Sequence, residues 1–238
     1  MFIDIHVHAT RIPGPPRDGR QAFATPEQLI GRFDPIGIER AVLLPLVSPE
    51  TYLPQANEDI LEMAERFPTR FIPFCNVDPR AVNNTVDAPL DEVFKYYKAH
   101  GVKGIGEVTA NLPFRHPMVQ NLFKHAEATG LPVTFHVATQ TTGGLYGLHD
   151  EQGLPGLEYS LGRFPTLKFF GHSQAFWSEI GQLDKPGDRG GYPRYTIRAE
   201  GAIPKLMRKH QNLYGDLSAG SGHNALARDP DHAVRFLD

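Results

Sequence analysis

The feature that most constrains the fold of this 238-residue chain is a regular alternation of short apolar runs with longer amphipathic segments. Short runs rich in Val, Ile, Leu and Phe are typical of strands buried on both faces, and such strands belong to parallel sheets covered by helices. The alternation therefore predicts an α/β fold with a parallel sheet. The predicted strands cover residues 2–8, 41–44, 71–75, 102–107, 132–136, 167–172 and 213–216.

Start and stop signals place helices between these strands. Thr25 is expected to cap the first helix, Pro26 suits its first position, and Gln28 completes a capping box. Gly130 follows an amphipathic segment and is expected to stop it. Pro73 is unusual inside a strand, so a bulge or an early strand end is expected there. The helices expected after the first cover residues 57–67, 89–100, 117–129, 156–163, 198–210 and about 224–238.

The length of the chain and the number of strand–helix units favour one barrel. A (β/α)₈ barrel typically takes about 250 residues, so we predict that residues 1–238 form a single TIM-type barrel domain. No Gly-x-Gly-x-x-Gly follows the first strand, which argues against a dinucleotide-binding fold. We identify seven strands in the sequence, so the barrel is expected to lack its eighth strand at the C-terminus.

An absent eighth strand would leave the edges of the first and seventh strands unpaired, whereas a closed barrel has no free edges. Three explanations are open: the sequence is a C-terminally truncated fragment, a partner chain closes the gap, or the chain tolerates an open barrel. We favour truncation, because the final residues, 235–238, are predicted to end the last helix rather than to begin a strand.

Composition and charge exclude several classes of protein. The formal net charge of −3 gives no basic field for nucleic acid, no apolar run approaches the ~20 residues of a membrane span, and no signal-peptide pattern opens the chain. Cys75 is the only cysteine, which rules out an intrachain disulfide and a thiolate metal cluster. We predict a cytoplasmic protein with a small-molecule substrate and neither a nucleic-acid nor a membrane partner, and a homo-oligomer stays open.

Two histidines at the end of the first strand are the first candidate site residues. His6 and His8 are two positions apart on a strand, so their side chains point the same way. Two imidazoles on one strand face can chelate a single metal ion. The alternative is a pair of polar residues where the strand meets its loop.

Three later strands also end in residues that bind metals. Glu107 ends the fourth strand, His136 the fifth and His172 the sixth. One histidine of this kind is more often a core or loop residue, but several at the carboxyl ends of barrel strands converge on one small volume. We therefore predict a shared metal site, and its ligands are His6, His8, Glu107, His136 and His172.

These motifs resemble the amidohydrolase superfamily, and most of all its amidohydrolase-related branch. The resemblance covers essentially the whole chain and rests on segments 4–8, 104–107 and 171–173 together with His136. It implies that the His-x-His pair and the fifth- and sixth-strand histidines bind metal, and that Glu107 takes the variable fourth-strand position. Nitrogen and oxygen ligands suit a divalent metal. Zinc is the default expectation, as one or two ions, with manganese, iron or nickel as alternatives.

One departure concerns the aspartate that the family carries at the end of its eighth strand, where it binds metal and transfers a proton. Asp216 follows the seventh predicted strand, so by position it does not match that aspartate. It could still contact substrate or a metal-bound water. We therefore regard Asp216 as a candidate catalytic residue beside His172, which would orient or protonate the reacting group.

The resemblance implies a metal-dependent hydrolase, in which a metal-activated water attacks an amide, ester or lactone of a small molecule. A decarboxylase or hydratase of the same branch is one alternative. A metal-binding barrel that is catalytically impaired by the missing aspartate is another.

Loop arginines could pair with a carboxylate substrate. Phe176 and Trp177 could either wall the pocket or pack beneath the loop that follows the sixth strand. The arginines concerned are Arg11, Arg17, Arg20 and Arg115.

Overall fold

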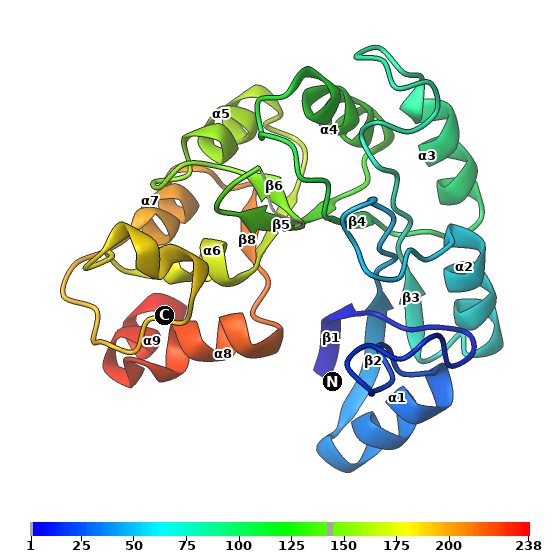
Figure 1. Ribbon diagram of the computed structural model, residues 1–238, viewed down its shortest axis with the longest axis horizontal. Helices are drawn as coiled ribbons and strands as arrows, with labels where there is room; N and C mark the ends of the chain where they lie inside the picture. The colour runs from blue at the N-terminus through cyan, green and yellow to red at the C-terminus, as the bar shows by residue number, and fades with distance from the viewer. Residues whose placement is uncertain (1, 142–144) are drawn as a thin grey trace.

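The computed structural model describes residues 2–141 and 145–238 of the chain. Parallel strands line the inner side of an arc, and helices α1 to α5 follow one another along its outer side (Figure 1). The strands are β1 Phe2–Val7, β2 Ile38–Leu43, β3 Phe71–Pro73, β4 Ile105–Val108, β5 Val133–Ala138, β6 Leu148–His149, β7 Phe169–His172 and β8 Leu213–Gly215.

The helices alternate with these strands as the sequence predicts, which confirms the α/β class. Short 3₁₀ segments extend three of the connections: η1 Asp34–Ile36, η2 Ser178–Ile180 and η3 Pro186–Gly190. The α-helices are α1 Pro26–Phe33, α2 Asn57–Arg66, α3 Leu90–Ala99, α4 Pro117–Thr129, α5 Pro155–Arg163, α6 Gln174–Trp177, α7 Ala202–Lys209, α8 Ala219–Ala227 and α9 Pro230–Leu237. Within the described ranges, none of these helices has the length and apolar character of a membrane span.

Backbone pairing orders the strands along the arc. One parallel sheet has the order β1-β2-β3, and a second has the order β4-β5-β7-β8. The amide of Cys75 donates to the carbonyl of Gly104 at 3.0 Å and the amide of Gly106 donates to the carbonyl of Cys75 at 2.8 Å, so β3 and β4 are neighbours. In residues 2–141 and 145–238, no backbone hydrogen bond joins β8 to β1. The barrel is therefore not closed by hydrogen bonds.

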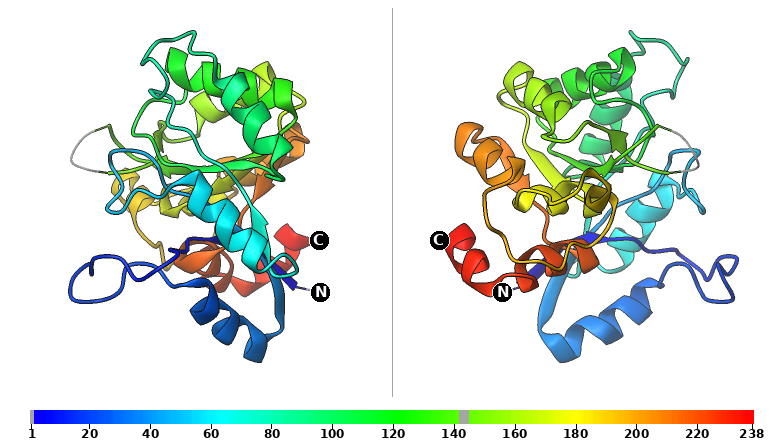
Figure 2. Two further views of the ribbon diagram at one scale, coloured as in Figure 1. Left: turned by 90° about the vertical axis from the view of Figure 1, so that its right-hand side faces the viewer. Right: turned by 60° about the vertical axis from the view of Figure 1, so that its left-hand side comes forward.

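The apolar core lies between the sheets and the surrounding helices. Phe135 on β5 and Phe169 on β7 are fully buried, and Phe123 of α4 meets Phe169 edge-on with ring centroids 5.1 Å apart. A smaller cluster beneath α1 and α2 includes Leu43 and Phe71. Helices thus cover the outer face of the strands, and the loops that follow β1 and β2 extend from one side of the molecule (Figure 2).

Capping and stop residues in the sequence predicted the ends of several helices and strands correctly. Thr25 and Gln28 form the predicted capping box at α1. Helix α4 has the predicted bounds and ends at Gly130, whose φ of 67° is in the left-handed region that glycine adopts most readily. Strand β3 ends at Pro73, as expected for a residue that has no amide hydrogen to donate.

Two predicted helices needed correction. The helix predicted over 198–210 begins only at Ala202, because Glu200 still forms an antiparallel bridge with Gly181. The helix predicted from 224 to the end is two helices, α8 and α9. Asp229 accepts a hydrogen bond from the amide of His232 and Pro230 has no amide hydrogen, so a new helix starts there. The two-residue strand β6, which pairs with β5, was not predicted.

Candidate metal centre

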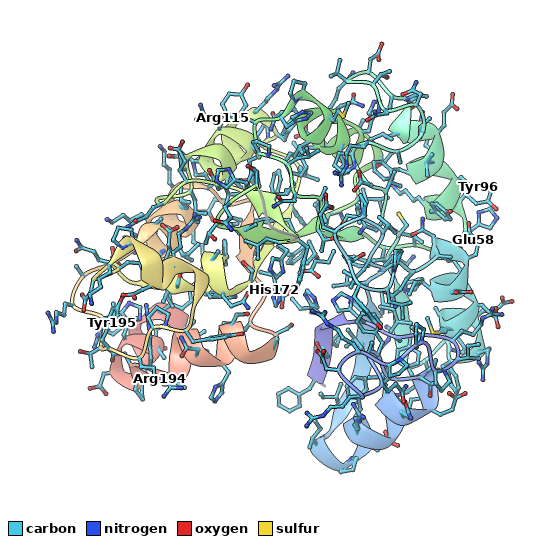
Figure 3. All side chains as sticks on the ribbon, in the orientation of Figure 1. Glu58, Tyr96, Arg115, His172, Arg194 and Tyr195 are labelled. Atoms are coloured by element: carbon cyan, nitrogen blue, oxygen red, sulfur yellow. The ribbon has the colours of Figure 1, made fainter. Side chains whose placement is uncertain are left out.

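The five predicted ligands come together at the carboxyl ends of β1, β4, β5 and β7. Strand pairing sets His136 directly opposite His172, and the His6 and His172 ring centroids are 4.1 Å apart. His172 lies near the centre of the molecule, on the inner side of the arc (Figure 3). The strand ends therefore position the side chains that the sequence pattern singled out.

The closest approach involves two imidazole nitrogens and one carboxylate oxygen. Nε2 of His6 and Nε2 of His8 are 3.1 Å apart, because the two residues lie on the same side of the strand. Glu107 Oε2 lies 3.5 Å from Nε2 of His6 and 3.3 Å from Nε2 of His8. Ligand atoms of His6, Glu107 and His172 also all lie within 4.8 Å of one another.

This spacing fits a divalent ion. Zinc binds imidazole nitrogen and carboxylate oxygen at about 2.0–2.2 Å, and a tetrahedral arrangement then sets the ligand atoms roughly 3.3 Å apart. The three observed separations of 3.1, 3.3 and 3.5 Å bracket that value. The donor set and these separations are therefore suited to a metal ion.

Three of the four histidines have their second ring nitrogen anchored. Nδ1 of His6 donates to Asp216 Oδ2 at 2.6 Å, and Nδ1 of His8 donates to the carbonyl of Leu44 at 2.8 Å. Nδ1 of His136 donates to Glu107 Oε1 at 2.8 Å. Carboxylates and carbonyls only accept, so each of these rings carries hydrogen on Nδ1. Histidines that bind metals are commonly held in this way.

His172 differs from the other three. Its Nδ1 is buried and has no hydrogen-bond partner among the described residues, although Asp216 Oδ2 lies 3.5 Å away. Burial and the neighbouring charge of His6 lower the pKa of His172 to about 4. The ring is therefore neutral at pH 7, and within residues 2–141 and 145–238 its Nδ1 has no hydrogen-bond partner.

The charged groups at the centre shift one another's pKa values. Burial alone would raise the pKa of Glu107, but His6 and His136 hold it well below its usual value. Burial alone would lower the pKa of His6, but Glu107 and Asp216 raise it to about 10. Two ionised carboxylates thus flank a protonated His6 when no ion is bound.

Asp216 adjoins this centre from β8. Its side chain is fully buried, and besides His6 it accepts a hydrogen bond from the amide of Ser218 at 3.0 Å. The sequence placed Asp216 near the site but gave no sign of its partner. Tyr146 was missed altogether: its ring packs against His136 with centroids 4.4 Å apart, and it belongs to a loop that no strand or helix pattern marks.

The surface has several cavities, and not all of them lie at the candidate metal centre. A cavity of about 120 Å³ lies beside His136 and Tyr146. A larger hollow of about 940 Å³ is lined instead by Glu158, Lys205 and Lys209, on α5 and α7. Because His136, one of the five candidate ligands, lines the smaller cavity, we take that cavity as the part of the surface that belongs to the candidate centre.

The structure bears on two further predictions, one on the aromatic residues that follow β7 and one on the loop arginines. Phe176 and Trp177 are buried and meet edge-on at 5.1 Å, so they pack beneath the loop and do not wall a pocket. Arg115 donates to the carbonyl of Pro155 and lies at the outer rim, away from His172 (Figure 3). Arg11 pairs with acidic residues of α2. The described contacts thus give neither arginine a place at the centre.

The chain belongs to the amidohydrolase family, whose model matches residues 3–238. This match confirms the resemblance that the sequence motifs indicated. Members of the superfamily generally bind divalent metal ions, and the family match supports an enzyme of this superfamily. Comparison with curated protein sequences gave no match.

Solved structures share the fold at low sequence identity. An uncharacterised TIM-barrel protein, Bb4693 from Bordetella bronchiseptica, aligns with a TM-score of 0.57 and 17% identity over 83% of this chain. The chain spans 62% of the length of that protein. A 2,6-dihydroxybenzoate decarboxylase from Rhizobium aligns with a TM-score of 0.53 and 14% identity, covering 99% of this chain and 90% of the decarboxylase. These likenesses support the TIM-type fold.

Proposed function

We propose that residues 1–238 form a single metal-dependent hydrolase domain that cleaves an amide, ester or lactone of a small molecule. The observation that carries the proposal is the convergence of His6 Nε2, His8 Nε2 and Glu107 Oε2 at 3.1–3.5 Å. We further propose zinc as the ion, with His136 as a further ligand and with His172 beside the ion for proton exchange. When bound, such an ion would lower the pKa of a water to about 7 and polarise a carbonyl group.

The protein groups around the ion have distinct proposed roles. His6 and His8 present Nε2 because Nδ1 of each ring is held by an acceptor. Glu107 supplies negative charge and, through Oε1, orients His136. Because Asp216 has both carboxylate oxygens engaged within the protein, we assign proton exchange with the water or leaving group to His172, whose Nδ1 has no partner among the described residues.

A metal-dependent decarboxylase is the second candidate. The observation that favours it is the likeness to the Rhizobium 2,6-dihydroxybenzoate decarboxylase over 99% of this chain. A product assay in ¹⁸O-labelled water separates the two candidates. Hydrolysis places the label in the acid product, whereas decarboxylation releases carbon dioxide and adds no solvent oxygen to the remaining product.

Metal analysis tests the site itself. Purified protein loaded with zinc should hold at least one ion per chain, and His6→Ala and His136→Ala should each lower that content. His100→Ala is the matched control, since His100 is exposed at the end of α3 and should leave metal content unchanged. If both site variants keep the metal content of the unmodified chain, the proposed ligand set is wrong.

The role of His172 has its own test. His172→Asn should retain zinc but reduce kcat on any ester or lactone that the chain turns over by about 10²–10⁴-fold, the range typical of a lost proton-transfer group. Loss of zinc in this variant would instead make His172 a ligand. Zinc binding without turnover by the unmodified chain on every amide, ester, lactone and carboxylic acid tested would support the impaired, metal-binding alternative.

A further inference from the structure

Asp216 is an unusual acidic residue because its side chain is fully buried and both of its carboxylate oxygens accept hydrogen bonds. Oδ2 accepts from Nδ1 of His6 at 2.6 Å, and Oδ1 accepts from both the amide and the hydroxyl of Ser218. The backbone of Asp216 is held as well, because its amide donates to Gly171 at 2.9 Å and its carbonyl accepts from Nε1 of Trp177 at 2.6 Å. The carboxylate therefore has one well-defined orientation.

This orientation fixes which nitrogen of His6 carries hydrogen when the ring is neutral, as it must be to bind a metal ion. A carboxylate only accepts, so Nδ1 of His6 must be the donor, and Nε2 is left to face His8 and Glu107. A neutral imidazole held at Nδ1 by a carboxylate has its lone pair on Nε2 and is a stronger base. The contact thus prepares His6 as a ligand on the side where the other donor atoms converge.

We propose that Asp216 is a positioning residue, which holds His6 in the orientation and tautomer that bind the metal, and that Ser218 in turn fixes Asp216. The inference rests on the proposed metal site and gives Asp216 a role other than proton exchange with substrate. His8 is held by a neutral backbone carbonyl, whereas His6 is held by a charge. Asp216 therefore raises the affinity of His6 for a cation in a way that the His8 contact does not.

The contact also spans the strands that lack backbone pairing. His6 and Asp216 are 210 positions apart, on β1 and just after β8. No backbone hydrogen bond joins β1 and β8 in the parts of the chain that the structure describes. The same side-chain contact that prepares a ligand therefore also joins the two ends of the arc.

The test measures metal affinity and ligand geometry rather than turnover. Purified full-length protein is titrated with Zn²⁺ against a chelator of known affinity, and its Co²⁺ form is examined by visible absorption. Asp216→Asn should weaken Zn²⁺ binding about 10–100-fold, the usual effect of removing such a partner, and should shift the Co²⁺ bands. Ser218→Ala should also weaken Zn²⁺ binding and shift the Co²⁺ bands, but by smaller amounts. Asp231→Asn, a change at an exposed position of α9, should alter neither.

The outcomes separate the inference from the proposed function. If the unmodified chain binds no Zn²⁺, the proposed metal site itself fails. If that chain binds Zn²⁺ and Asp216→Asn binds it within twofold with unchanged Co²⁺ bands, the positioning role is overturned and the metal site stands. If circular dichroism shows that Asp216→Asn does not fold, Ser218→Ala becomes the deciding variant, because it removes only the hydroxyl donor to Asp216. Unchanged Zn²⁺ affinity and unchanged Co²⁺ bands in Ser218→Ala then count against the inference.

Discussion

Two junctions between neighbouring parts of the arc are held in different ways. Between β3 and β4, the amides of Cys75, Lys103 and Gly106 donate to carbonyls across the junction at 2.8–3.0 Å. Between β8 and β1, the described contacts include no such backbone bond, and the closest polar link is His6 with Asp216. The first junction depends on the backbone, which every residue provides. The second depends on two ionisable side chains that also belong to the candidate metal centre.

This difference implies that the protonation and metal loading of the candidate centre affect the junction between β8 and β1 more directly than the junction between β3 and β4. A change in protonation or metal loading has no direct effect on the amide–carbonyl bonds between β3 and β4. The same change acts directly on His6, and therefore on the contact between β1 and Asp216. The junction at β8 and β1 is thus where the chemistry of the centre should be visible in the stability of the fold.

The largest effect is expected from His6→Ala in protein freed of metal by a chelator. The change leaves Asp216 and Glu107 as buried carboxylates without their shared partner, and breaking a buried ion pair in this way typically costs about 3–5 kcal/mol. Urea unfolding followed by circular dichroism measures the loss, with His100→Ala as control. A cost below about 1 kcal/mol would mean that the junction does not depend on this contact.

Metal binding should have the next largest effect. A ligand that binds only the folded state stabilises it by about 2.7 kcal/mol when its free concentration is 100 times Kd. For a chain of this size each kcal/mol raises Tm by roughly 2–4 °C. Calorimetry with and without Zn²⁺ measures the shift. Hydrogen exchange should show greater added protection in β1 than at the β3–β4 junction, where amides are already paired; equal protection at both would remove the distinction between the junctions.

Whether a feature of the fold or of the centre could be predicted from the sequence depends on how far apart in the chain the interacting residues are. The α1 capping box and the His6–His8 pair depend on residues two or three positions apart, so their patterns were readable. The break between α8 and α9 is also marked locally, by Asp229 and Pro230, although a single helix from about residue 224 to the end is predicted there.

Other features of the centre left no local pattern. The partner that holds His8 is the carbonyl of Leu44, and a backbone carbonyl has no signature in sequence. The partner of His6 is 210 positions away. The barrel arrangement indicated which strand ends converge, but only three-dimensional packing determines which side chain contacts which ring nitrogen.

The pH dependence of stability should also distinguish the two junctions. The folded-state pKa of His6 is raised to about 10, against about 6.5 in an unfolded chain. Its contribution to stability is therefore fully present below pH ~6.5 and is lost as pH rises toward 10. Because one proton is involved, metal-free protein should lose at most about 1.4 kcal/mol per pH unit in this window.

Urea unfolding at several pH values, with chelator and with Zn²⁺, checks this dependence. Zinc displaces the proton from His6, so the loaded protein should not show the same decline between pH 7 and 9. Asp216→Asn should also have a shallower decline, since one of the two carboxylates that raise the pKa of His6 is gone. A decline of equal slope in all three samples would point to a group other than His6.

The smallest effect is expected where β1 meets solvent. Phe2 on β1 is 72% exposed, whereas Phe71 on β3 is 2% exposed. Phe2→Ser should change the free energy of unfolding by no more than about 0.5 kcal/mol, as is usual for surface positions, while Phe71→Ala should cost about 3–5 kcal/mol through the cavity it leaves. Urea unfolding of both variants measures the contrast. A large cost for Phe2→Ser would show that this end of β1 is covered in solution, and the comparison between the two junctions would then have to include the group that covers it.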